Sequence, residues 1–193
     1  MIEIHRFLFF ETDLTQPLPP IPAARIPLEI HPLRAEEVET LAPAFRVAGL
    51  ALQEVGRRLA RGDVCIIALS GSHLVHFQWA AFSPVRIGGK GESLGLTLHL
   101  RAGEAYSYDA VTLVPWRGRG IHPVVSEYLA QYERGRGYTR HILYVNARNR
   151  ASRKTIARLR RAHTKTVWAF RLLEGRWQVL LGATCAGSPS LTL

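Results

Sequence analysis

The apolar positions of this chain follow two periods, which together predict a mixture of strands and helices. Short runs that are apolar, or that alternate between apolar and polar residues, are typical of strands when turn residues bound them. Such runs lie at residues 2–10, 28–32, 64–69, 74–82, 96–100, 105–114, 141–146, 167–173 and 176–181. We expect 64–69 and 74–82 to form one hairpin and the last two runs another. Runs 96–100 and 105–114 are expected to be successive antiparallel strands.

Three other stretches carry helix signals. Residues 35–59 have apolar residues at helical spacing, and Pro43 predicts that this stretch is divided into two helices. Residues 123–134 repeat the same spacing and end at a pair of glycines. Asn149, a residue type favoured at helix N-caps, predicts a further helix behind it.

The length of 193 residues is that of one domain. We expect an N-terminal strand or arm and a proline-rich connector in residues 1–26, the domain in 27–185, and a flexible tail in 186–193. The apolar runs are far too short to cross a bilayer, and charged residues interrupt the N-terminal run, unlike in a signal peptide. These features predict a cytoplasmic protein without membrane contact. The two cysteines form no C-x-x-C pair, and no metal site is predicted.

A turn rich in glycine and arginine follows the strand predicted at 105–114. Its glycines let the backbone approach a bound group without a Cβ in the way, and the first amides of the next helix have no partner within that helix. Such amides favour an anion, and the two arginines add positive charge beside them. We therefore expect the pyrophosphate of a cofactor to bind at Arg117, Gly118, Arg119, Gly120, Ile121 and His122.

Two other phosphate-binding motifs do not fit the chain. A Walker A loop needs Ser or Thr after its lysine, whereas Gly91 follows Lys90. A dinucleotide fingerprint needs a third glycine where Pro123 stands, and an acidic residue about 20 residues further on, where none is found. The turn that binds acyl-coenzyme A is the motif that remains.

This segment resembles the signature of the GNAT acyltransferases, the Gcn5-related N-acetyltransferase superfamily. In that signature a strand ending in V-x-P precedes R/Q-x-x-G-x-G/A at the start of a helix. Here Leu113-Val114-Pro115 precedes Arg117, Gly120 stands at the first glycine position, and His122 replaces the usual Gly or Ala.

A second element of the family follows at the expected distance. The family pattern N-x-x-S, continued by a helix, matches Asn149 and Ser152, while Arg160 and Arg161 replace its final Gly-Phe. The specific residues of the resemblance lie between 105 and 160.

The resemblance implies an α/β fold of the α+β type, with a mixed, mostly antiparallel sheet of six to seven strands flanked by about four helices. It implies acetyl-CoA or another acyl-CoA as cofactor, in a gap where the strands ending at Pro115 and Asn146 splay apart. One backbone amide near Leu113 or Val114 is expected to stabilise the oxyanion. The implied cofactor-binding residues are Leu113, Val114, Arg117, Gly118, Arg119, Gly120, Ile121, His122, Asn149 and Ser152.

The acceptor end is expected on the strand before the turn. Asp109 is the acid nearest the turn, so we expect it to serve as the base or to bind the acceptor amine, with Glu104 as a second candidate. The aromatic residues Tyr106 and Tyr108 are expected to wall the acceptor pocket. Many family members carry a tyrosine that acts as the general acid, seven residues after the Asn that matches Asn149. This chain has Ile156 at that position. That leaves Ser152, Tyr144 or water as the acid.

The net charge is +10, and its distribution matters more than its size. Residues 117–171 carry 14 Lys and Arg against two acids, so the excess lies in the predicted cofactor half, where it would attract coenzyme A. Seven of these cations lie between Arg148 and Arg161, either on a solvated helix face or on a surface for nucleic acid or an acidic partner.

Several alternatives stay open at this level. The acceptor is expected to be a small-molecule amine or a peptide N-terminus, and edge strands in the C-terminal hairpin are compatible with a homodimer. An acyl-CoA sensor without turnover, and a basic module that binds nucleic acid, are the alternatives to an N-acetyltransferase.

Overall fold

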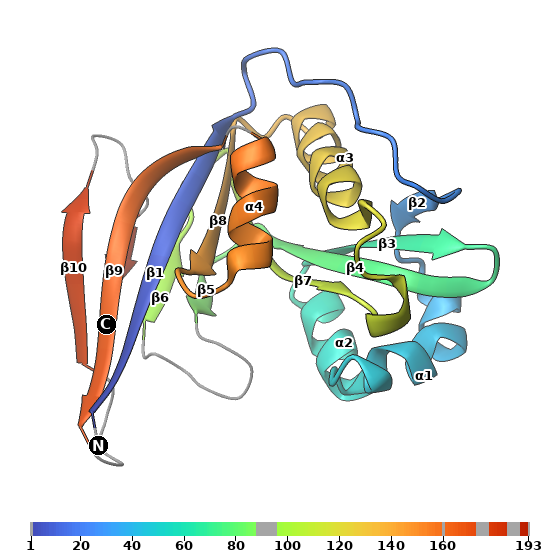
Figure 1. The fold of residues 1–193 in the computed structure, drawn as a ribbon, viewed down its shortest axis with the longest axis horizontal. Coiled ribbons are helices and arrows are strands. Elements are labelled where there is room, and N and C mark those ends of the chain that lie inside the picture. The colour runs from blue at the N-terminus through green and yellow to red at the C-terminus, as the bar shows by residue number, and fades with distance from the viewer. Residues whose placement is uncertain (1, 88–95, 160, 173–177, 185–189, 193) are drawn as a thin grey trace.

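The structure is a computed structural model that describes residues 2–87, 96–159, 161–172, 178–184 and 190–192. Its centre is an eight-stranded sheet in the order β10-β9-β1-β8-β7-β4-β3-β2 (Figure 1). All neighbours are antiparallel except β7 and β8, which are parallel. The strands of this sheet are β1 (Ile2–Asp13), β2 (Glu29–Pro32), β3 (Val64–Ser70), β4 (His73–Ala81), β7 (Glu104–Thr112), β8 (Arg140–Asn146), β9 (Ala162–Leu172) and β10 (Gln178–Thr184).

Two pairs of helices cover opposite faces of the sheet. Helices α1 (Val38–Val47) and α2 (Leu52–Ala60) pack with Cys65 and Ile67 of β3, whereas α3 (Ile121–Gly135) packs with Ile66 and Ala68 of the same strand. This arrangement follows from the pleat, which turns alternate side chains to opposite faces. Helix α4 (Arg150–Arg158) lies near α3, and none of the described helices is long and apolar enough to cross a membrane (Figure 1).

The predicted architecture is confirmed, and the sheet has one strand more than the predicted upper limit. The extra strand is β1, which lies inside the sheet between β8 and β9 instead of forming a separate arm. Its Phe7 and Phe9 are buried in the core, which explains why this strand is held between two neighbours. The connector at residues 14–28 then passes over α3 to β2, and Gln131 of α3 donates to the carbonyl of Pro19 (Figure 1).

The division between α1 and α2 was predicted at the wrong residue. Pro43 lies inside α1, on its exposed side, where water can satisfy the Glu39 carbonyl that lost its partner. The helix ends instead at Val47, with Ala48 as its C-cap, and the next residue, Gly49, has φ 75°. The Gly49 amide donates to Arg46 O at 2.8 Å, and Leu50 N donates to Phe45 O at 2.9 Å. These two bonds form a Schellman motif, which requires the left-handed conformation that glycine adopts freely.

Two predictions about the strands at the edges were also wrong. Strand β6 (Leu96–His99) does not join β7 but pairs with β5 (Val85–Ile87) in a second, three-stranded sheet. The third strand is β11 (Ser190–Thr192), which pairs with β6, so this part of the expected flexible tail is held by a ladder. The pairing of β9 with β10 is confirmed, and the turn predicted for this hairpin, around Glu174-Gly175, lies outside the described residues.

Candidate functional site

The two parallel strands at the centre of the sheet separate along their length. Strands β7 and β8 pair from Glu104 with Arg140 to Ser107 with Leu143, and no further rung follows among the described residues. Beyond this point β7 stays on β4 up to Thr112, and β8 stays on β1 up to Asn146. The strands therefore diverge, as the family resemblance implied, and leave an opening through the sheet.

A β-bulge in β7 borders this opening. Tyr108 pairs with Trp79 and Val111 pairs with Phe77, so two residues, Asp109 and Ala110, oppose Gln78 alone. Asp109 has φ 44°, and it is the only non-glycine residue with positive φ in the described part of the chain. The bulge places the Asp109 side chain on the wall of the cavity described next.

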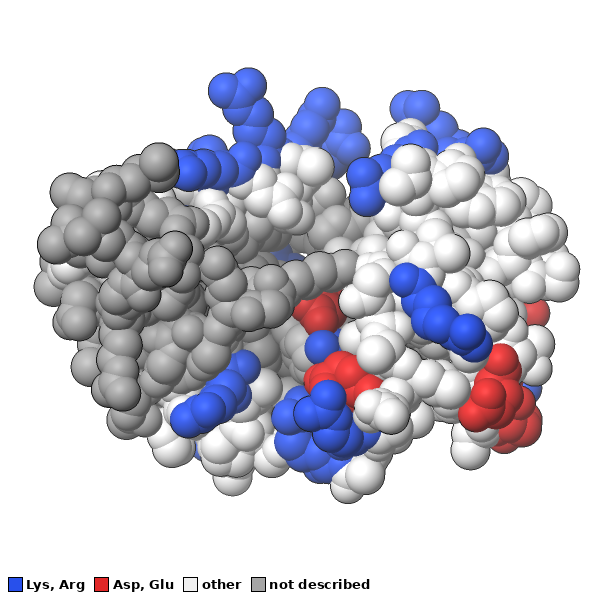
Figure 2. Space-filling view, turned by 90° about the horizontal axis from the view of Figure 1, so that it is seen from below, with Lys and Arg blue, Asp and Glu red and all other residues white. Residues whose placement is uncertain are grey.

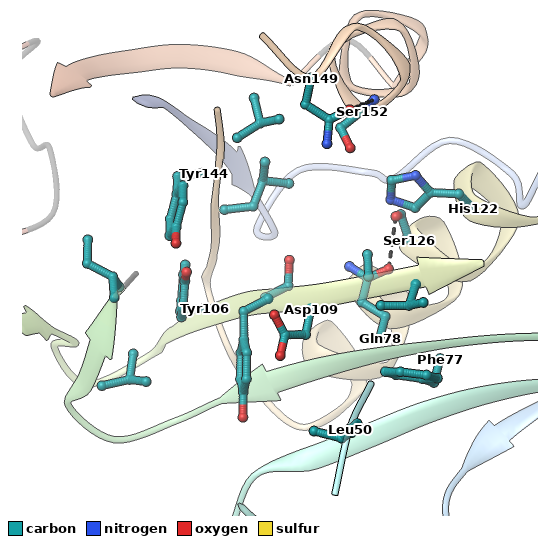
Figure 3. A pocket seen from close by; sticks show the side chains of 18 of the residues that line it. Leu50, Phe77, Gln78, Tyr106, Asp109, His122, Ser126, Tyr144, Asn149 and Ser152 are labelled. Atoms are coloured by element: carbon teal, nitrogen blue, oxygen red, sulfur yellow. Dashed lines mark hydrogen bonds between the residues drawn. The ribbon is translucent and has the colours of Figure 1, made fainter. Parts of the chain in front are cut away.

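A cavity of about 730 Å³ passes through the opening. One end is lined by the α1–α2 region and β5, and the other by α3 and α4, with the two diverging strands between them. Figure 3 shows Asp109 and Tyr106 on one side, Asn149 and Ser152 opposite, and His122 and Ser126 on the α3 side. The residues of β7, β8, α3 and α4 on its wall include Tyr106, Ser107, Tyr108, Asp109, Tyr144, His122, Ser126, Asn149, Ser152 and Ile156.

The bulged carboxylate is held by one arginine of α2. Arg58 Nη2 donates to Asp109 Oδ2 at 2.8 Å, and Arg58 Nε donates to Glu54 Oε1 at 2.9 Å. The guanidinium lies over the rings of Trp79 and Tyr108, 5.2 and 4.9 Å from their centroids. No sequence pattern connected α2 with Asp109, because the two are about fifty residues apart and meet only in the folded chain.

Three tyrosines stack along the wall of the cavity. The ring centroids of Tyr106 lie 5.8 Å from Tyr108 and 6.1 Å from Tyr144, with nearly parallel planes. The Tyr108 hydroxyl donates to Asp63, and burial, reinforced by that bond, raises its pKa. Burial also raises the pKa of Tyr106, so both hydroxyls keep their protons at neutral pH. The Tyr106 and Tyr144 hydroxyls point toward each other (Figure 3).

The glycine turn presents free amides, as predicted. Gly118 and Gly120 have φ 77° and 78°, and Gly120 is the N-cap of α3. Among the described residues, the amides of Gly118, Arg119 and Gly120 donate to no acceptor, and α3 adds the unpaired amides of its first turn. A Cβ at either glycine would point into open space, so a ligand could approach the backbone there. Arg117 and Arg119 are exposed beside it.

One of the two backbone amides expected to stabilise the oxyanion, that of Leu113, already has an acceptor. The Leu113 amide donates to Val75 O at 3.0 Å, and its carbonyl accepts from Trp116 N at 2.9 Å. Val114 begins a short 3-10 turn (Val114–Trp116) and is 69% exposed. The Leu113 amide is therefore engaged in β-sheet bonding and is not free for an oxyanion. Neither residue lines the cavity.

The second predicted element forms the opposite wall. Asn149 is the N-cap of α4, and its side chain accepts from Ser152 N at 3.1 Å, as expected. Ser152 and the buried Ile156 line the cavity. Arg161, predicted as part of a basic helix, lies beyond α4 and is 7% exposed, contacting Ser126 O and Thr12. It belongs to the cavity wall instead of the basic surface.

His122 has a role that its motif position did not predict. Its ring stacks on that of the fully buried His76 at 5.5 Å, and it lines the cavity. Burial, with a smaller contribution from the charge of Arg161, lowers the pKa of His122 to about 4. The imidazole is therefore neutral near pH 7. The described residues contain no group of three or more His, Cys, Asp or Glu placed to hold a metal ion.

No known family profile and no curated protein matches the sequence. Solved structures do match. A GCN5-related N-acetyltransferase from Sphaerobacter thermophilus matches with TM-score 0.62 and 15% identity, over 87% of this chain and 51% of that chain. A putative GNAT-family acetyltransferase from Novosphingobium aromaticivorans matches with TM-score 0.58 and 15% identity, over 86% of this chain and 63% of that chain. A GCN5-related N-acetyltransferase from Kribbella flavida matches with TM-score 0.54 and 16% identity, over 88% of this chain and 58% of that chain.

These likenesses define the fold. The chain has the fold of the GNAT superfamily. It spans between 51% and 63% of the length of these three solved structures.

Proposed function

We propose that this chain is an N-acyltransferase that moves an acyl group, acetyl in the simplest case, from acyl-CoA to a primary amine. The observation that carries the proposal is the cavity through the sheet. It joins the α3 and α4 face, near the turn with free amides, to the α1 and α2 face, where Asp109 lies. A donor and an acceptor that enter from opposite faces would meet between β7 and β8.

The residues around the turn fit a diphosphate. The free amides of residues 118–120, the first turn of α3 and two exposed arginines are donors of the kind that phosphate oxygens accept. Asn149 and Ser152, on the far wall, are proposed to contact the pantetheine arm. Acyl-CoA supplies an activated acyl group, and the amine attacks its carbonyl directly.

The acceptor needs more help than the donor. An alkyl amine with a pKa of ~10.4 is neutral in about one molecule in 2,500 at pH 7, a handicap of roughly 4.6 kcal/mol. A thiol with a pKa of ~8.5 leaves without much assistance. We assign to Asp109 the binding and deprotonation of the ammonium group, with Tyr106 and Tyr108 as the pocket wall. Tyr144 and Ser152 are the candidate proton donors to the thiolate, since Ile156 cannot donate.

Calorimetry with acetyl-CoA tests the donor site. We expect micromolar affinity and a loss of at least about 100-fold in Gly120→Glu, because a carboxylate at the turn repels phosphate and the backbone there is left-handed. Gly71→Glu is the matched control, since Gly71 also has positive φ and open space around its Cβ but lies in the β3–β4 turn. Equal affinities for the two variants would refute the placement.

A panel of amines then separates an enzyme from a sensor. Release of free thiol that requires both acetyl-CoA and an amine indicates acyl transfer. Tight acetyl-CoA binding without turnover on any amine would indicate a sensor, and salt-dependent binding of nucleic acid that CoA does not affect would favour a basic binding module.

A further inference from the structure

The acceptor end of the cavity carries an unusual number of charged side chains. Figure 2 looks onto this face and shows acidic side chains beside basic ones in the hollow near its centre. Two carboxylates line this end, those of Glu54 and Asp109. The cations that line it are Arg57, Arg58, Arg61 and Arg86.

The carboxylates at this end are largely occupied by two of the arginines. Glu54 accepts from Arg57 at 2.7 Å through Oε2 and from Arg58 at 2.9 Å through Oε1. Asp109 accepts from Arg58 through Oδ2, and no bond to its Oδ1 occurs among the described residues. Arg58 therefore holds both carboxylates in place, while Asp109 Oδ1 stays available to an ammonium group.

Of the two remaining arginines that line this end, only Arg61 has a carboxylate partner among the described residues. Arg61 pairs with Asp63, which is fully buried behind it and does not line the cavity. Arg86, on β5, is exposed and has no carboxylate partner in the part of the chain that the structure describes. Counted over the described residues, three carboxylates face four arginines, and the excess charge is that of Arg86. Arg57, 76% exposed in its side chain, keeps donors that Glu54 does not use.

We propose that the acceptor is an amine that also carries an anionic group, a carboxylate or a phosphate. This inference rests on the proposed acyl transfer and specifies its acceptor. The ammonium group binds at Asp109 Oδ1, and the anionic group binds at Arg86, with Arg57 as a second guanidinium that lines the same cavity. A simple alkylamine would bring one more positive charge to an end that already has an excess, whereas an anion receives charge-assisted, bidentate hydrogen bonds from guanidinium.

Equilibrium binding tests the acceptor class without requiring turnover. The protein is first saturated with CoA, which has no acyl group, and amines are titrated by calorimetry in matched pairs. The pairs are phosphoethanolamine with ethanolamine, and an α-amino acid with its amide. We expect the anionic member of at least one pair to bind at least about 10-fold more tightly than its neutral partner. This difference in affinity, called the gap below, should narrow as salt is added. The pair with the larger gap identifies phosphate or carboxylate.

Variants locate the anionic group. Arg86→Ala should remove most of the gap, because it should weaken the binding of the anionic amine and leave the binding of the neutral amine unchanged. Arg46→Ala, an exposed arginine of α1 outside the cavity, should leave the gap unchanged. In acetyl transfer, the same change should appear in KM for the anionic amine.

The outcomes separate the two proposals. Equal affinity within every pair, including no binding by either member, overturns the anionic acceptor while leaving CoA binding intact. A gap that survives Arg86→Ala also overturns it. Absence of CoA binding in the first step overturns the proposed function itself.

Discussion

Asp109 combines a strained backbone with the side chain that we propose as the base. Its φ of 44° lies in a region that L residues rarely adopt, although Asp tolerates it better than most. Such strain costs on the order of 1 kcal/mol or more, and it persists because the ladder on both sides of the bulge enforces it. The residue type was recognisable in the sequence, but its bulge and its ion pair with Arg58 were not.

Asp109→Asn tests the base at this residue. Asparagine keeps the shape and the tolerance of left-handed φ but loses the charge. We expect kcat/KM to fall on the order of 100-fold at pH 7 and by clearly less at pH 9.5, where more of the amine is already neutral. Initial rates of thiol release at both pH values provide the measurement. An equal loss at both values would assign Asp109 to acceptor positioning alone.

At the scale of elements, α4 and α3 are attached to the sheet in different ways. Helix α4 begins with a side-chain cap, Asn149, which is predictable from the sequence, and most of the surface of the helix is exposed. Helix α3 is tied by a buried network: Glu133 Oε2 lies 2.6 Å from His141 Nδ1 of β8, whose Nε2 lies 3.3 Å from Ser107 Oγ of β7. This network stabilises the rungs at which the two parallel strands still pair.

Removal of the Asn149 cap should lower stability by a modest amount. Asn149→Ala should lower the free energy of unfolding by about 1 kcal/mol, because the Ser152 amide loses its acceptor. Arg150→Ala, in the same exposed first turn, should change it by less than about 0.5 kcal/mol. Urea unfolding measures both, and a larger effect at Arg150 would contradict the cap.

The buried network predicts a larger, non-additive loss. His141→Leu leaves the Glu133 carboxylate buried without its partner, so the free energy of unfolding should fall by about 3–5 kcal/mol. The double variant with Glu133→Leu should be more stable than His141→Leu alone, because the unpaired charge is gone. A double-mutant cycle from urea unfolding gives the coupling, and strict additivity would refute it.

At the scale of the whole molecule, two histidines make stability depend on pH. Burial lowers the pKa of His76 and of His122, the latter to about 4, against 6.5 for the free side chain. Below pH 6.5 the unfolded chain therefore binds protons that the folded chain does not. Stability should fall as the pH drops from about 6.5 to about 4, and His122 adds no further loss below that.

His122→Gln removes one of these groups. Between pH 7 and pH 4 the wild-type free energy of unfolding should fall more than that of the variant, by up to about 3 kcal/mol. His73→Gln, an exposed change on β4, should follow the wild type. Urea unfolding at three pH values measures the difference, and parallel curves for wild type and His122→Gln would contradict it.

The local features of this chain were predictable because they depend on neighbours in the sequence. The β3–β4 hairpin, the cap at Asn149, and the glycine turn before α3 each follow from residue types within a few positions of one another. The error at Pro43 has a local cause as well. Pro43 by itself predicts the end of a helix, whereas Gly49, six residues later, supplies the left-handed cap.

By itself, the sequence determined which segments form helices and strands, where most of them end, and the glycine turn before α3, since side-chain sterics and hydrogen bonding within a few residues decide these. Only the tertiary structure decided that β1 lies inside the sheet, that Arg58 meets Asp109, that Arg161 is buried, and that His122 stacks on His76 beside the cavity. These contacts join segments far apart in the chain, and their stability comes from packing and from desolvated charge pairs. No local pattern of residues encodes such a contact.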